Sequence, residues 1–162
     1  MQELVTRAER ISTLLKARKE TIVIAESSTG GLVSAALLAI PGASAYFVGG
    51  AVVYTKTARS QFFDISDETM NGMRASTQPY ALLLATTARR RFRTSWALGE
   101  SGATGPAGNR YGDASGHCCI AVTGAVERAI TLETGVDDRY ANMFAFAAAA
   151  LDLLESVLTE AG

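Results

Sequence analysis

The chain has 162 residues, 48% of them hydrophobic, which favours a single globular domain over 1–162 and excludes an intrinsically disordered chain. Its 15 Lys and Arg residues against 16 Asp and Glu residues give a net charge of −1. This balance disfavours a nucleic-acid or membrane partner and leaves a small charged metabolite open. The charged amino terminus has no apolar stretch of signal-peptide or membrane-spanning length, so we expect a cytoplasmic protein.

The first half of the chain predicts helices alternating with strands. An apolar stripe from Leu4 to Leu15 indicates an amphipathic helix, and the run from Thr21 to Ile24 is typical of a strand buried on both faces. The residues 46–54 indicate a second strand, which its double glycine weakens. The expected helices cover residues 3–16, 32 to near 41, a segment after residue 54 that ends at about 63, and 67–72. The expected strands cover residues 21–24 and 46–54.

The second half predicts one long helix, a strand, a glycine-rich loop, a hairpin and a final helix. The loop over 101–116 holds five of the 15 glycines, which either present N–H groups to a phosphate or only form a flexible surface connection. The expected elements are helices over 79–91 and 140–158 and strands over 96–99, 117–122 and 129–133. This order predicts an α/β fold, a three-layer α/β/α domain with a mixed, mostly parallel sheet.

The stretch Thr21–Leu38 is where the sequence places its chemistry. The strand ends in Glu26, Ser27, Ser28 and Thr29, and a double glycine precedes an apolar helical face. Ligands of open α/β sheets bind at the carboxyl ends of strands, where a helix amino terminus offers unpaired N–H groups to an anion. The alternative is that these hydroxyls only cap the helix.

Two further polar stretches follow strands, at Tyr54–Arg59 and at Ser101–Gly108. If the three strands are parallel neighbours, all three stretches meet at one edge of the sheet. In a helical turn, Lys56 and Arg59 share a face because they are three residues apart. We therefore expect one site with hydroxyl nucleophiles, a tyrosine and cations.

The residue types exclude several kinds of chemistry. No HExxH, CxxC or paired-carboxylate motif is present, so we expect neither a metal nor a cofactor. The sole histidine, His117, has no evident triad partner and is expected to be structural. Cys118 and Cys119 point to opposite faces of a strand, so we expect buried reduced thiols and no disulfide. A serine activated by an amine, with Ser27 as first choice and Ser28 or Thr29 as rivals, indicates hydrolysis of an amide or ester.

Three segments resemble the CinA C-terminal domain family. AESSTGG, PGASAYFVGGAVVYTKTAR and SGATGPAG are similar, in the same order, to that family's AESCTGG, GSSA…F..G.V.Y(S/T)N.AK and SGIAGP(D/G)G. The resemblance implies the family's best-known activity, metal-free deamidation of nicotinamide mononucleotide by a Ser/Lys pair. By position, it implies that the serine is Ser27, the tyrosine is Tyr54, the glycine loop is Ser101–Pro106 and an arginine of the last helix is Arg139.

The family's lysine is Arg59 in this sequence, the family's cysteine is Ser28, and the acidic residue after GP is Ala107. Arginine stays protonated and cannot accept the serine proton, so Lys56 is the alternative base. The expected catalytic residues are Ser27, Tyr54, Lys56 and Arg59. The expected substrate-binding residues are Ser28, Thr29, Gly30, Gly31, Gly102, Thr104, Gly105 and Arg139.

Three functions follow from this set. The first is an amidohydrolase acting on a pyridine nucleotide, and the second is a non-catalytic member that keeps the nucleotide pocket, as a sensor or interaction module. The third is hydrolysis of a different amide or ester. The apolar, alanine-rich helices suit packing between subunits, so a homo-oligomer is a further expectation.

Overall fold

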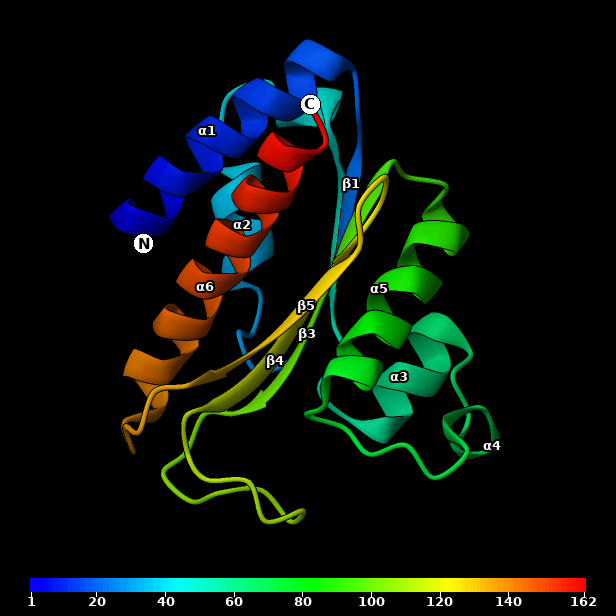
Figure 1. The fold of residues 1–162 in the computed structure, drawn as a ribbon, viewed down its shortest axis with the longest axis vertical. Coiled ribbons are helices and arrows are strands. Elements are labelled where there is room, and N and C mark those ends of the chain that lie inside the picture. Colours follow the sequence, from blue (N-terminus) through cyan, green and yellow to red (C-terminus); the bar gives the residue numbers. More distant parts are fainter.

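The computed structural model describes residues 1–162 and contains a five-stranded sheet between two layers of helices (Figure 1). The strands are β1 (Ile22–Glu26), β2 (Phe47–Val52), β3 (Trp96–Ala103), β4 (His117–Thr123) and β5 (Arg128–Glu133). The helices are α1 (Gln2–Arg18), α2 (Leu32–Leu38), α3 (Lys56–Phe63), α4 (Asp67–Met70), α5 (Gln78–Phe92) and α6 (Arg139–Glu160), with a short 3₁₀ helix, η1 (Ala43–Ala45). The α/β sandwich expected from the sequence is confirmed.

The sheet has the strand order β2-β1-β3-β4-β5. Strand β1 pairs in parallel with β2 and β3, whereas β4 pairs antiparallel with both β3 and β5. Only β4 therefore runs against the others, and the predicted hairpin at one edge of the sheet is confirmed. The carboxyl ends of β2, β1 and β3 consequently lie side by side.

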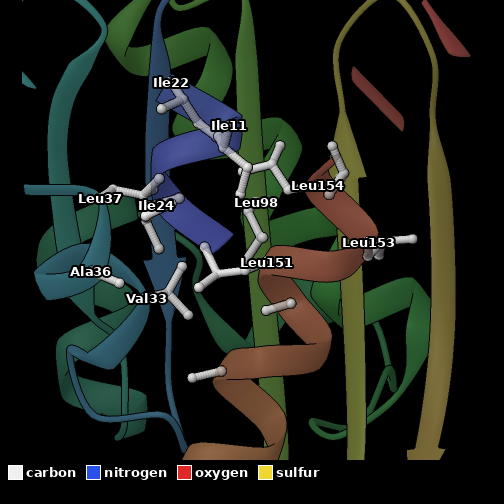
Figure 2. Close-up of a cluster of buried hydrophobic side chains, with 14 of the residues drawn as sticks. Ile11, Ile22, Ile24, Val33, Ala36, Leu37, Leu98, Leu151, Leu153 and Leu154 are labelled. Atoms are coloured by element: carbon white, nitrogen blue, oxygen red, sulfur yellow. The ribbon is translucent and has the colours of Figure 1, made fainter. Parts of the chain in front are cut away.

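Each face of the sheet is covered by its own group of helices. Helices α1, α2 and α6 cover one face, and α3, α4 and α5 cover the other (Figure 1). Figure 2 shows Ile24 and Leu98 of the sheet beside Val33 of α2 and Leu151 of α6. Residues Val23 and Ala25 belong to the opposite core, which explains why β1 is apolar at nearly every position.

Helix α6 is long and apolar enough to cross a membrane, judged by length and composition alone. Half of its most apolar window is buried within the fold, where Phe146, Leu151 and Leu154 belong to the larger core. Its composition therefore suits a core helix of this sandwich.

Strand β3 is four residues longer than predicted. Pairing with β4 continues from Glu100 through Ala103, so the glycine-rich loop begins at Thr104 and the expected loop start at Ser101 is wrong. Gly102 lies within this pairing, and a Cβ atom there would meet the carbonyl oxygen of His117 at 2.6 Å. A glycine at this position therefore marks close approach of two strands, where the sequence suggested a flexible turn.

Candidate functional site

The three polar stretches meet at the carboxyl ends of β2, β1 and β3, as the sequence predicted. They line a cavity of about 320 Å³, which we call cavity A. Its lining residues are Ser27, Val53, Tyr54, Thr55, Lys56, Arg59, Ala75, Ser76, Tyr80, Ser101, Gly102, Asn109, Arg110 and Tyr111. Parallel strand order, combined with short loops, is what brings segments 75 residues apart to one place.

A second cavity of about 260 Å³, cavity B, adjoins the first. It is lined by Ser27, Ser28, Gly30, Val52, Tyr54, Arg139 and Met143. Ser27 and Tyr54 line both cavities, so they stand at the boundary between them. The Ser27 hydroxyl makes no hydrogen bond within the chain, although the residue is only 7% exposed. This hydroxyl is therefore free to meet a ligand.

The turn that carries Ser27 is held from beneath by Glu100, a residue that the sequence analysis missed. One carboxylate oxygen of Glu100 accepts the backbone N–H of Ser27 at 2.9 Å and that of Thr29 at 3.0 Å. The other oxygen accepts the hydroxyl of Ser28. Three consecutive residues are thus fixed by one side chain from the neighbouring strand.

A second carboxylate, Glu26, lies next to Glu100. The Thr29 hydroxyl is 2.7 Å from an oxygen of Glu26 and 2.9 Å from an oxygen of Glu100. Both glutamates are fully buried, and neither forms a salt bridge with a lysine, arginine or histidine. The only polar groups that compensate these charges are hydrogen-bond donors of the chain itself.

Glu26 occupies part of the amino terminus of α2, where the sequence analysis expected N–H groups for an anion. The N–H groups of Val33 and Ser34 donate to Glu26 at 3.2 and 3.0 Å. The N–H group of Gly30 donates to the carbonyl oxygen of Ser27. Glu26 thus satisfies two of the first N–H groups of α2, as an acidic side chain just before a helix can do.

The two cations after β2 converge on one carboxylate. Arg59 is buried and donates to the carbonyl oxygen of Ile65 at 2.9 Å and to Asp67 at 2.5 Å. The Lys56 ammonium lies 3.4 Å from the other oxygen of Asp67, and its side chain is 59% exposed. The hydrogen bond from Arg59, followed by that from Lys56, lowers the pKa of Asp67. Lys56 and Arg59 therefore share a face, as expected.

Arg139 reaches the site from the first turn of α6. Its guanidinium donates to the carbonyl oxygen of Gly105 at 2.9 Å and to the Tyr54 hydroxyl at 3.1 Å. Two residues carried over from the family resemblance, far apart in the chain, are thus in direct contact across cavity B. The arginine is fixed by the glycine loop and presents a positive charge to cavity B, which Ser27 also lines.

The loop between β3 and β4 closes the other side of cavity A through an ion-pair network. Arg74 pairs with Asp113 at 2.5 Å, and Asn109 donates to the same carboxylate at 2.7 Å. The Arg74 hydrogen bond lowers the pKa of Asp113. This network places Arg110 and Tyr111 along cavity A, because both follow Asn109 directly.

His117 supports the same loop, in the structural role expected for it. Its Nδ1 contacts Glu133, its Nε2 lies 2.8 Å from the carbonyl oxygen of Ser76, and Asp113 is 3.8 Å away. Burial acts to lower the pKa of His117, but the hydrogen bonds to Glu133 and Ser76 and the charge of Asp113 outweigh it, so the pKa is raised. Two acceptors for two ring nitrogens favour the protonated imidazolium.

The remaining predicted binding residues divide between cavity walls and buried supports. Gly102 lines cavity A, and Ser28 and Gly30 line cavity B. Thr29 and Thr104 are buried and line neither cavity. Gly31 and Gly105 also line neither cavity, although Gly105 binds Arg139 through its carbonyl oxygen.

Several lining residues were missed by sequence reasoning, namely Ser76, Tyr80, Asn109, Arg110 and Tyr111. They lie on loops and on the start of α5, where no local pattern marks a site. Glu100 had a usable signal, because a carboxylate within a strand as apolar as WALGE is rarely buried without a specific role.

Comparison with known sequences and structures gives consistent matches. The CinA C-terminal domain family matches residues 5–158. A CinA-like protein of Prochlorococcus marinus (strain MIT 9313) is 38% identical over 117 residues, which are 72% of this chain and 27% of that protein. A CinA-like protein of Gloeobacter violaceus is 33% identical over 131 residues, 80% of this chain and 31% of that protein. The chain thus spans less than a third of the length of these curated relatives.

Two solved structures share the fold along nearly the entire chain. A competence/damage-inducible protein, CihA, from Agrobacterium tumefaciens has a TM-score of 0.86 and 28% identity, covering 96% of this chain and 95% of its own. A CinA superfamily protein from Klebsiella pneumoniae 700603 has a TM-score of 0.90 at 23% identity, covering 97% and 98%. The second match, at its low identity, supports the fold alone.

Proposed function

Because the chain belongs to the CinA C-terminal domain family, we propose that it is an amidohydrolase that converts nicotinamide mononucleotide and water to nicotinate mononucleotide and ammonia. One observation carries this proposal. The unbonded hydroxyl of Ser27 stands at the boundary of two cavities, beside the contact between Tyr54 and Arg139. A nucleophile, a hydrogen-bond donor and a cation for the phosphate are thereby within one site.

The proposed reaction uses Ser27 as the nucleophile. Its oxygen attacks the carboxamide carbon, the C–N bond breaks with transfer of a proton to the leaving nitrogen, and ammonia departs. Water then hydrolyses the acyl-serine to release the carboxylate and restore the hydroxyl. Lys56 is the only amine lining cavity A, so in this proposal it leaves Asp67, accepts the Ser27 proton as a neutral amine and passes it to the leaving nitrogen.

The experiment is an ammonia-release assay with purified protein and nicotinamide mononucleotide. Ser27→Ala should abolish release, because removal of a nucleophile typically costs several orders of magnitude in turnover. Ser12→Ala is the matched control, since Ser12 is equally buried but bonds only to Glu9 within α1. An unchanged rate in the Ser27 variant would remove this residue from the reaction.

A second candidate function is a nucleotide-binding module without turnover. It is favoured by the position of Arg59, which replaces the family's lysine and is locked to Ile65 and Asp67, while no base contacts the Ser27 hydroxyl. A ligand-induced rise in Tm with no ammonia release would select this function. Release of ammonia or alcohol from other amides or esters, but not from the mononucleotide, would select a hydrolase of different specificity.

Substitution Arg59→Lys tests the second candidate directly. It supplies an amine that can lose its proton, so deamidation should appear or rise by at least about ten-fold, at a stability cost of about 1–2 kcal/mol for the lost hydrogen bonds. Arg91→Lys is a close control, because Arg91 also binds a backbone carbonyl (Phe62) and an aspartate (Asp64). No gain in the Arg59 variant would show that the exchange of lysine for arginine does not limit activity.

A further inference from the structure

Two buried carboxylates without a cationic partner support the turn that carries Ser27. Glu26 and Glu100 are both fully buried and are bridged by the Thr29 hydroxyl, at 2.7 and 2.9 Å. The other buried or half-buried acid near the site, Asp113, has Arg74 as a partner. The two glutamates accept hydrogen bonds from neutral donors and form no salt bridge within the chain.

Glu100 is the glutamate closer to the reacting position. Its carboxylate accepts the backbone N–H of Ser27 at 2.9 Å, and Ser27 lines both cavities. Charges act strongly across a medium of low dielectric constant, so the negative potential of Glu100 extends into the floor of the cavity.

The walls of cavity A are also suited to a positive group. Tyr54, Tyr80 and Tyr111 line it, and the faces of aromatic rings attract cations. The cations that line cavity A have contacts of their own: Lys56 and Arg59 bind Asp67, and Arg110 is exposed and stacked over Tyr111. The site is therefore polarised, with the Glu100 carboxylate behind Ser27 and two exposed arginines that form no salt bridge, Arg110 at cavity A and Arg139 at cavity B.

We propose that Glu100 is a specificity-determining residue whose charge selects a carboxamide on a positively charged ring. This inference rests on the proposed function and deepens it, because it names the ring charge as the property that is recognised. Nicotinamide mononucleotide has this polarity, with a pyridinium ring at one end and a phosphate at the other. Its ring would lie over the floor at Ser27, and its phosphate would lie toward Arg139.

The expected size of the effect follows from Coulomb's law. A unit negative charge about 7 Å from a positively charged ring, at an effective dielectric constant near 20, changes the binding constant roughly fifty-fold. Solvent in an open cavity reduces this factor to about ten-fold. A neutral ring of the same shape should bind more weakly by this factor.

The test compares two ligands that differ only in ring charge. These are nicotinamide mononucleotide and benzamide riboside 5′-phosphate, in which a carbon atom replaces the ring nitrogen. Calorimetric Kd values should favour the pyridinium ligand about ten-fold in the unmodified chain. Equal Kd values for the two ligands would overturn the proposal without any variant.

Glu100→Gln removes the charge and keeps the shape. The amide oxygen still accepts the N–H groups of Ser27 and Thr29, and the amide nitrogen can donate to Ser28, so the turn should persist. The Kd for the pyridinium ligand should rise about ten-fold and that for the neutral ligand should stay unchanged. An equal loss for both ligands would indicate a merely structural residue and would contradict the proposal.

Glu20→Gln is the matched control, because it removes a carboxylate that binds Trp96 at the opposite end of the same two strands. Both Kd values should stay unchanged in this variant. Ammonia release is measured in parallel and separates the two proposals. Selective binding without release would reject the hydrolase function alone, and release without selectivity would reject the role of Glu100 alone.

Discussion

His117 supports the loop between β3 and β4, and the strength of this support depends on the protonation of its ring. Its imidazolium bonds Glu133 and the carbonyl oxygen of Ser76, and it faces Asp113. The other charged or titratable groups around it are Cys119, which touches its ring, and Arg74, which pairs with Asp113. These contacts connect the first residue of β4 to the loop that closes cavity A.

Because the folded-state pKa of His117 is raised, protonation favours the folded state. Its contribution is fully present below the unfolded pKa of about 6.5 and is lost as the pH rises through the folded value. The free energy of unfolding, measured with urea, should therefore fall more steeply between pH 6 and pH 8.5 in the unmodified chain than in His117→Gln. Parallel pH profiles for the two proteins would argue against this linkage.

Within strand β2, the two adjacent glycines, Gly49 and Gly50, differ in the space available for a side chain. A Cβ atom on Gly50 would lie 2.0 Å from the hydroxyl of Ser34, which bonds Glu26. A Cβ atom on Gly49 would meet nothing within 4 Å. Only Gly50 is therefore required by the contact between β2 and α2.

Gly50→Ala should destabilise the fold by about 1–3 kcal/mol, because the methyl group displaces Ser34 and loosens the cap of α2. Gly49→Ala should be neutral or slightly stabilising, because alanine restricts the unfolded chain. Urea unfolding of the two variants provides the comparison. A similar loss for both would show that the cost arises from the strand itself and not from Ser34.

Most elements of this fold could be predicted because their local patterns are strong. The apolar stripe of α1, the β-branched run of β1 and the polar caps of α3 and α6 each act over a few residues. The end of β3 could not be predicted in the same way. Its last four residues are held by pairing with β4, and glycine and serine there resemble a loop when read alone.

The candidate site was predictable in the position of Ser27 and in its meeting strands, but not in its supports. Ser27, Tyr54 and Arg139 are marked by motifs and meet as expected, while their catalytic and binding roles stay predictions. The apolar strand around Glu100 could have marked it as unusual, but its contacts with residues more than 70 positions away have no local signal. The same holds for Asp67, whose pairing with Arg59 depends on how α4 folds back.

At the scale of the whole molecule, the two cores on either side of the sheet are separate packing units. The larger one contains Ile24, Leu98 and Leu151, and the other contains Val23, Leu84 and Ala97. Strand β1 contributes to both, and its carboxyl end carries Ser27. The position of Ser27 therefore depends on both helical layers.

The adjacent cysteines of β4 belong to different sides of this arrangement, and both are free and buried, as predicted. Cys118 lies in the larger core, and Cys119 packs with Ala81 of α5. Burial raises the pKa of both thiols, so neither should react while its own layer stays closed.

The thiols of Cys118 and Cys119 can therefore report separately on the two helical layers. In single-cysteine chains made by Cys118→Ser or Cys119→Ser, maleimide labelling under native conditions measures how often each layer separates from the sheet. Cys119 should be labelled faster, because its cluster has only three buried members. Equal labelling rates would mean that the two layers open as one cooperative unit. A nucleotide that slows the labelling of only one cysteine would show which helical layer it stabilises.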